Sequence, residues 1–184
     1  MTTTPWFPCP GRSDDADQAT FLAQQYVQLM QGEFSATCKV LAAVKDDNRD
    51  FKPDAKSRTA WELATHLATA DMWFLDSVIT GQFAWDPERV KQVEGQFSSV
   101  AEVVALYERT FPEKLKAVQA MAAGDLAKSI SFFAMMEKPA AEFLGMANNH
   151  SVHHREQLAA YLRGIGSKVP AIYGGSADEP MPGA

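Results

Sequence analysis

The sequence predicts an all-α fold, an antiparallel four-helix bundle, and three observations support this prediction. Four long segments carry apolar residues at helical spacing or lie between helix start and stop signals. Two of them follow a capping-box sequence. Almost no stretch shows the alternation of a β-strand. Because each apolar stripe must be buried against others, we expect the helices to pack together as one bundle.

The length of 184 residues suits a single domain spanning 1–184. We expect its core at about 19–168, with a loose N-terminal segment over 1–18 and a loose C-terminal tail. A net charge of −6 without any cluster of Lys and Arg argues against nucleic acid as a partner. The chain shows neither a signal peptide nor about 18 consecutive apolar residues, so we expect a cytoplasmic protein without a membrane partner.

The first helix is expected over roughly 19–44, and the polar stretch 46–57 ends it. Its apolar positions are Phe21, Leu22, Tyr26, Leu29, Met30, Phe34, Cys38, Leu41 and Val44. A capping box, Thr59-Ala-Trp-Glu62, predicts the start of the second helix. We expect this helix to run to about Thr80 and to stop at Gly81.

The third helix is expected to start after a linker over 81–97, at the capping-box sequence Ser99-Val-Ala-Glu102, and to end near Ala123. Pro112 lies inside it and predicts a kink or a break, because proline removes an amide donor and clashes with the preceding turn.

The segment 128–136 is apolar without helical spacing, and both a short strand and a packed loop stay open for it. The fourth helix is expected over roughly 139–163, between Pro139 and the glycines that follow it. Three connections exceed ten residues, so they permit crossovers as well as simple up-down links. The order of the helices is therefore left open.

All four histidines lie on two of these helices, His66 on the second and His150, His153 and His154 on the fourth. His150 and His154 are one turn apart and differ by about 40° in direction, so both can reach one ion. They share the direction of the apolar stripe on their helix, whereas His153 is rotated by roughly 100° from His154. His66 lies at the border of its own stripe. We therefore predict a divalent metal ion bound by His66, His150 and His154.

The chemistry of such a site follows from its ligands. The two cysteines, Cys9 and Cys38, form no thiolate site with close spacing, so nitrogen or oxygen must bind the metal. Three neutral imidazoles leave a coordination position open, as in catalytic sites. Water there could have its pKa lowered toward ~7, or the ion could activate a thiolate. The residues 150–154 lack the glutamate of the zincin motif, which disfavours a metalloprotease.

Several other residues are open to two interpretations. The aromatic residues Trp61, Trp73, Phe74, Phe132 and Phe133 are typical of a core, but those near the histidines could line a substrate pocket. Asp71, Arg155 and Glu156 fit pairs between helices and a solvated helix face equally well. The histidines themselves could be hydrogen-bonded core residues. That interpretation fails if the protein carries about one transition-metal ion per chain.

Residues about 20–175 resemble the DinB/YfiT-like superfamily of small bacterial metal-binding bundles. The resemblance rests on the second helix, WELATHLATADMWF, and on His-x-x-His-His-Arg-x-Gln-Leu, followed by Tyr-Leu-Arg and Gly-x-x-Val-Pro. It implies a four-helix bundle with nickel or zinc on three histidines, which correspond to His66, His150 and His154. The residue after the arginine is often glycine in the family. Here it is Glu156, which adds bulk and charge at the flank of the site.

Two classes of function are open, and the resemblance implies the activities of the first. The first is a metal-dependent enzyme, either a low-molecular-weight-thiol S-transferase or a hydrolase, that acts on a small-molecule substrate; we expect His153 to be its catalytic acid–base or orienting group. The alternative is a non-catalytic stress-response protein that binds metal or a small ligand. Apolar residues outside the stripes could support a homodimer.

Overall fold

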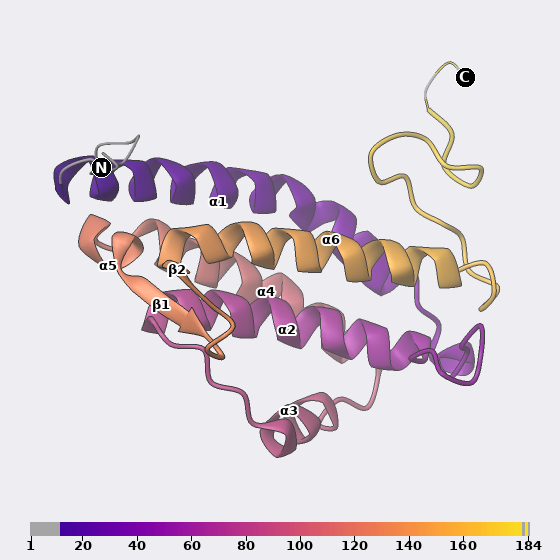
Figure 1. Cartoon of the computed structure of the whole chain (residues 1–184). Coiled ribbons are helices and arrows are strands. Elements are labelled where there is room, and N and C mark those ends of the chain that lie inside the picture. Colours follow the sequence, from indigo (N-terminus) through magenta and orange to yellow (C-terminus); the bar gives the residue numbers. More distant parts are fainter. Residues whose placement is uncertain (1–11, 182, 184) are drawn as a thin grey trace, which may run out of the picture.

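Four long helices form the body of the molecule, as seen in a computed structural model that describes residues 12–181 and residue 183 (Figure 1). They are α1 (Arg12–Ala42), α2 (Ala60–Thr80), α4 (Val100–Gln119) and α6 (Phe143–Tyr161). Helices α1 and α2 lie diagonally opposite each other, and both pack against α4 and α6. The core between the helices is almost entirely apolar. The predicted four-helix bundle is confirmed.

The helices run two in each direction. Lys45, just after α1, donates to the carbonyl of Gly166 after α6 at 2.6 Å, and the amide of Val100, the first residue of α4, donates to Asp46 at 3.0 Å. The C-terminal ends of α1 and α6 thus lie beside the N-terminal end of α4, and α2 starts at the same end of the bundle (Figure 1). Antiparallel contacts, α1 with α4 and α2 with α6, therefore alternate with parallel ones. The order that the sequence left open is up-down-down-up.

Helix α1 extends further toward the N-terminus than its apolar spacing predicts, and it ends at Ala42 rather than near residue 44. Its first turns contain the exposed residues Asp15 and Asp17, so no apolar stripe marks them. The segment expected to be loose therefore includes residues that belong to a helix, while residues 1–11 lie outside the described part of the chain. A short 3₁₀ helix, η1 (Asp46–Asn48), follows α1.

The start and stop signals of α2 act as predicted. The Thr59 hydroxyl accepts from the Glu62 amide at 3.1 Å, and the Glu62 carboxylate accepts from the Thr59 amide at 2.7 Å. Gly81 ends the helix in the left-handed conformation, with a φ of 70°. Both halves of the capping box are present, so they fix the first turn of the helix that carries His66.

The second predicted capping box forms only in half. The Ser99 hydroxyl accepts from the Glu102 amide at 3.4 Å. The Glu102 carboxylate instead accepts from the amide and the hydroxyl of Ser98, at 2.7 and 2.8 Å. The reciprocal bond is lost because a second serine competes for the carboxylate.

This difference gives a testable comparison of the two caps. Thr59→Ala is expected to lower the free energy of unfolding by about 1 kcal/mol, because it removes the hydrogen bond to the Glu62 amide. Ser99→Ala, whose bond is longer, is expected to cost less. Urea unfolding followed by circular dichroism measures both costs, and a larger loss for Ser99→Ala would contradict the comparison.

Two predictions about the middle of the chain are wrong. The linker 81–97 is not wholly irregular, because Pro87–Glu94 forms helix α3, which the Asp86 carboxylate caps by accepting from the amides of Glu88 and Arg89. Helix α4 ends at Gln119 rather than near Ala123. It continues through Pro112 without a break, so of the two expected outcomes there only a kink stays a prediction. A short helix, α5 (Ala123–Ala127), follows it.

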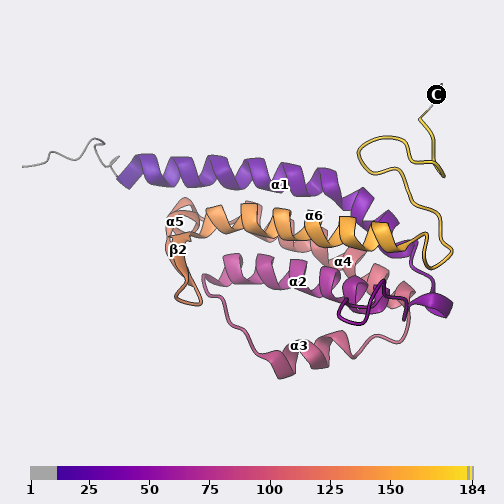
Figure 2. The same cartoon turned by 45° about the vertical axis from the view of Figure 1, so that its right-hand side comes forward.

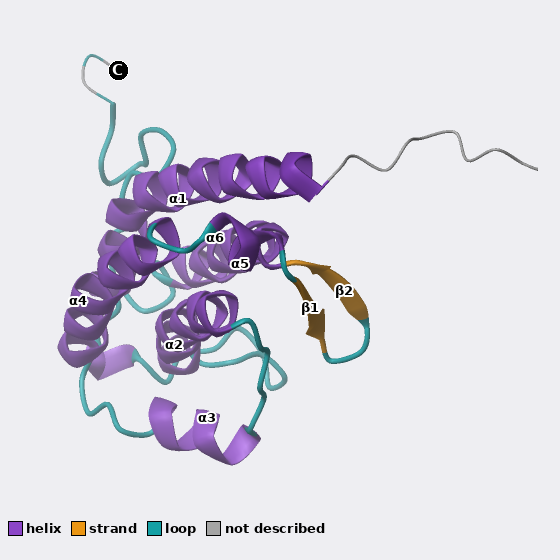
Figure 3. Ribbon diagram, turned by 90° about the vertical axis from the view of Figure 1, so that its left-hand side faces the viewer, coloured by secondary structure: helices purple, strands orange, loops and turns teal. Residues whose placement is uncertain are grey.

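The open segment 128–136 is a strand and a turn rather than a packed loop. Strand β1 (Ser129–Phe132) pairs antiparallel with β2 (Met136–Pro139), with Phe132 opposite Met136. The resulting hairpin projects from the side of the bundle (Figure 3). Its turn contains Phe133 and Ala134, both left-handed with φ of 52° and 56°. A 3₁₀ helix, η2 (Ala140–Glu142), then leads into α6, so the expected helix over 139–163 is shorter than predicted.

Helix α3 lies outside the bundle, next to α2, and none of its residues is buried (Figure 2). Within the described residues, no helix combines the length and the apolar character needed to cross a bilayer.

Candidate metal centre

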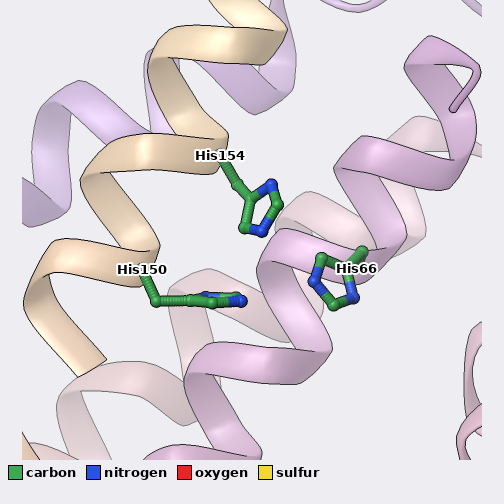
Figure 4. A group of neighbouring side chains, drawn as sticks. All are labelled: His66, His150 and His154. Carbon is green, nitrogen blue, oxygen red and sulfur yellow. The ribbon is translucent and has the colours of Figure 1, made fainter. Parts of the chain in front are cut away.

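Three imidazoles meet between α2 and α6 (Figure 4). His66 comes from α2, and His150 and His154 come from α6. Each offers a ring nitrogen that lies within 4.8 Å of the other two. The ring centroids are 4.4 Å apart for His150 and His154, and 4.7 and 5.3 Å from His66 to His154 and His150. The structure thus brings together the three histidines that the sequence singled out as ligands.

The local sequence explains this convergence. His150 and His154 are four residues apart, so they project from the same side of α6, and Leu158 continues that side into the core. On α2, Leu63 and Leu67 are fully buried, and His66 lies between them in sequence at the edge of their stripe. The antiparallel contact of α2 with α6 then places the three rings at the same height of the bundle.

Two of the histidines are held in the neutral form that binds metal. Burial, together with the neighbouring histidines, lowers the pKa of His150 from 6.5 to about 3. Burial and the proximity of His66 lower the pKa of His154 to about 4. Both rings are therefore unprotonated near neutral pH, and each offers a lone pair without a proton having to be removed.

The polar contacts of the three rings differ. Nδ1 of His154 lies 3.2 Å from Oε1 of Gln157, and Nδ1 of His66 lies 3.4 Å from Oε1 of Glu94. Nδ1 of His150 is buried and has no hydrogen-bond partner among the described residues. A buried nitrogen without a partner is costly unless another group binds there. Three imidazoles this close together, of which His150 and His154 are neutral near pH 7, fit a divalent transition metal.

His153, the expected catalytic group, lies apart from the cluster. Its side chain is exposed, and its ring centroid is 4.8 Å from that of its neighbour His154. It does not share the inward direction of the other three histidines.

A cavity of about 790 Å³ adjoins the cluster, and His66 and His150 form part of its wall. Five aromatic residues line it, namely Trp73, Phe74, Trp85, Phe132 and Phe133. Four of these, Trp73, Phe74, Phe132 and Phe133, are among the five residues that the sequence left open between core and pocket. They line the pocket, and Phe74 is the one of the four that is also buried in the core. Trp61, by contrast, lies under the Arg49 guanidinium, 4.2 Å from its ring centroid, and is not part of this wall.

The aromatic wall is held in place by contacts between separate elements. The Trp73 indole donates from Nε1 to the carbonyl of Ala84 at 2.7 Å, which ties the segment before α3 to α2. The ring of Phe133 lies parallel to that of Trp73, with centroids 6.2 Å apart. The hairpin and the linker thus both contribute to the shape of the cavity.

A second cavity, of about 1160 Å³, lies on the other side of α6. Residues of α1, β2 and α6 line it, among them His150 and His153. His150 therefore borders both cavities, whereas His153 borders only this one.

A buried carboxyl group connects three helices close to the cluster. Tyr107 of α4 and Ser151 of α6 donate to Oδ2 of Asp71 of α2, at 2.9 and 2.8 Å. Asp71 is fully buried, and this burial raises its pKa from 3.8 to about 7, against the opposing effect of the two hydrogen bonds. Of the two interpretations left open by the sequence, the pair between helices is correct for Asp71.

Arg155, one turn after Ser151 on α6, is also fully buried. Its guanidinium pairs with Glu33 of α1 and, at 3.1 Å, with Glu156. It also donates to the Tyr173 hydroxyl at 2.5 Å, and that hydroxyl donates to Glu33 at 2.9 Å. These contacts attach part of the C-terminal tail to the bundle.

Fold and cluster together define a small helical bundle with a three-histidine site beside an apolar cavity. The model of the DinB family matches residues 16–182, so the chain belongs to the DinB family. Among solved structures, a DinB-like protein from Bacillus cereus superposes with a TM-score of 0.67 at 23% identity, over 82% of this chain and 97% of that one. A DinB-like protein from Bacillus subtilis gives a TM-score of 0.62 at 19% identity, over 79% and 95% of the two chains. These likenesses show the fold. The comparison with curated proteins yields no match.

Proposed function

We propose that this protein is a metal-dependent enzyme that acts on a small electrophilic substrate. The observation that carries the proposal is the position of His66 and His150, which belong both to the three-histidine cluster and to the wall of the aromatic cavity. A ligand in the cavity would therefore lie directly beside the metal. Such an arrangement is typical of a catalytic rather than a structural site.

His66, His150 and His154 would hold the ion. Imidazoles suit zinc, nickel, copper and iron, and the resemblance to the family favours nickel or zinc among them. When bound, such an ion lowers the pKa of a thiol or a water molecule and so supplies a nucleophile at neutral pH. The neutral state of His150 and His154 allows them to serve as ligands across the physiological pH range. A low-molecular-weight thiol is the proposed co-substrate of the S-transferase version, and water is that of the hydrolase version.

The cavity favours an electrophile with an apolar or aromatic body, because five aromatic side chains form its wall. In S-transfer, the sulfur of the thiol would form a bond to the electrophilic carbon. The leaving group would depart with the bonding electrons, and the proton lost by the thiol would balance its charge. In hydrolysis, water would take the place of the thiol.

His153 remains our candidate for an acid–base or orienting group. Its imidazole lies beside His154 and borders the second cavity, from which it could exchange protons with solvent. His153→Ala tests this role. If His153 acts as an acid–base or orienting group, the rate of turnover measured at saturating metal should fall in this variant.

Protein purified without a histidine tag provides the test. Elemental analysis establishes whether about one ion is bound per chain. The protein, loaded with zinc or nickel, is then mixed with glutathione or cysteine and an aromatic electrophile such as 1-chloro-2,4-dinitrobenzene, and separately with a p-nitrophenyl ester and water. Thiol-dependent loss of the electrophile supports the S-transferase, and ester cleavage supports the hydrolase.

The alternative is a stress-response protein that binds metal or a small ligand without turnover. The same three histidines would serve it. Metal-loaded protein that produces no acceleration with any thiol or with water would support this alternative. Protein that binds no metal would contradict the enzyme and the metal-binding version of the alternative.

A further inference from the structure

Glu94 is the carboxylate closest to the histidine cluster. It is the last residue of α3, and its Oε1 lies 3.4 Å from Nδ1 of His66. Both side chains are largely shielded, with exposed fractions of 28% for Glu94 and 13% for His66. Among the described residues, Glu94 forms no ion pair with any lysine or arginine. Its contact with His66 is thus its one ion-pair contact among these residues.

The contact determines which nitrogen of His66 is available. Because Nδ1 faces Glu94, Nε2 is the nitrogen left for the cluster, and Figure 4 shows a ring nitrogen of His66 on the side of the other two histidines. His154 follows the same pattern, since its Nδ1 faces the Gln157 side chain at 3.2 Å. Two ligands of the proposed ion are thus oriented by a partner at Nδ1. The partner of His66 is the only one of the two that carries a charge.

A carboxylate behind an imidazole acts in a well-defined way. It accepts the Nδ1 proton, holds the ring in the tautomer with a free Nε2, and makes that nitrogen more basic. We propose that Glu94 is a positioning residue of the metal centre and increases its metal affinity through His66. The proposal rests on the function proposed above, because it requires His66 to bind the ion.

The position of Glu94 gives this role a structural basis. Asp86 and Pro87 start α3, and its eight residues then bring Glu94 to the edge of the aromatic cavity, within reach of α2. Without the helix, the linker would have no defined place for the carboxylate. In this proposal the short helix holds the Glu94 carboxylate beside His66, although none of its residues is buried.

Metal affinity of the whole chain provides the test. Kd for Zn²⁺ is measured by competition with a chromophoric chelator for the wild type, Glu94→Gln, Glu94→Ala and the matched control Glu88→Gln, an exposed glutamate of the same helix. We expect Kd to rise by about 10–100-fold in both Glu94 variants, as is usual when the outer partner of a ligand is lost. The control should keep the wild-type Kd. Circular dichroism verifies that all variants are folded.

The absorption spectrum of the Co²⁺-loaded proteins provides the second readout. Because Glu94 does not bind the ion in our proposal, the band shape should match in the wild type and in Glu94→Ala. A changed coordination spectrum would make Glu94 a direct ligand and overturn the positioning role, and so would an unchanged Kd in both Glu94 variants. An unchanged Kd leaves the proposed function intact. A wild type that binds neither Zn²⁺ nor Co²⁺ overturns both proposals.

Discussion

His150→Ala should abolish stoichiometric metal binding. His150 has the shortest ring-to-ring distance in the cluster, 4.4 Å to His154, and it is the histidine whose buried Nδ1 has no partner among the described residues. Its loss leaves two imidazoles, one on each helix. We expect affinity to fall by more than the ~10–100-fold that follows loss of an outer partner, so that elemental analysis finds little or no metal.

His153→Ala is the matched control for this loss. It removes an imidazole from the same turn of α6, but from an exposed position outside the cluster. It should retain about one ion per chain. If His150→Ala retained the same amount of metal as the wild type, the assignment of the ligands would be wrong. If His153→Ala lost the ion as well, His66, His150 and His154 would not be sufficient to bind the metal.

A second large effect concerns the pH dependence of stability at Asp71. Its pKa is about 7 in the folded protein and close to the ordinary 3.8 in the unfolded chain. Between these values the folded state keeps a proton that the unfolded state releases, so rising pH favours unfolding. The contribution of Asp71 to stability is complete below about pH 4, falls by roughly 4 kcal/mol up to about pH 7, and is constant above.

Asp71→Asn removes this titration while it keeps the size of the side chain. Urea unfolding of both proteins between about pH 5 and pH 8 should show a steeper loss of stability for the wild type than for the variant. Asp47→Asn, at an exposed aspartate, should leave the slope unchanged. Identical slopes in the wild type and Asp71→Asn would show that Asp71 ionises in the folded protein as readily as in the unfolded chain.

Local signals explain why the sequence identified the three histidines that the structure brings together. The spacing of His150 and His154 is fixed by the geometry of a single helix, and the capping box at Thr59 places His66 within the next one. These features depend on residues a few positions apart. They are therefore independent of how the helices are ordered in the bundle.

Features that depend on contacts between distant residues could not be predicted from the sequence. Asp71 meets Tyr107 and Ser151, and Arg155 meets Glu33, across helices whose order was open. Without the order of the helices, the sequence does not show whether Asp71 and Arg155 are buried or exposed to solvent. The role of Glu94 at His66 likewise depends on where the linker lies.

Helix α3 itself was missed although a signal was present. Asp86 followed by Pro87 is a regular helix start, with a capping side chain and a proline in the first turn. The helix is short and none of its residues is buried, so no apolar stripe accompanied that signal. Gly81, Pro87 and Gly95 together favoured an irregular linker instead.

The hairpin turn concentrates conformational strain at one end of the cavity wall. Phe133 and Ala134 both adopt the left-handed conformation, which costs roughly 1–2 kcal/mol for each residue that is not glycine. That conformation directs the Phe133 ring onto Trp73, while the three histidines proposed to bind the metal lie on α2 and α6. Substitutions in the turn can therefore reshape the cavity and relieve strain at the same time, without disturbing a ligand. The shape of the cavity and the geometry of the histidine cluster can thus change independently during evolution.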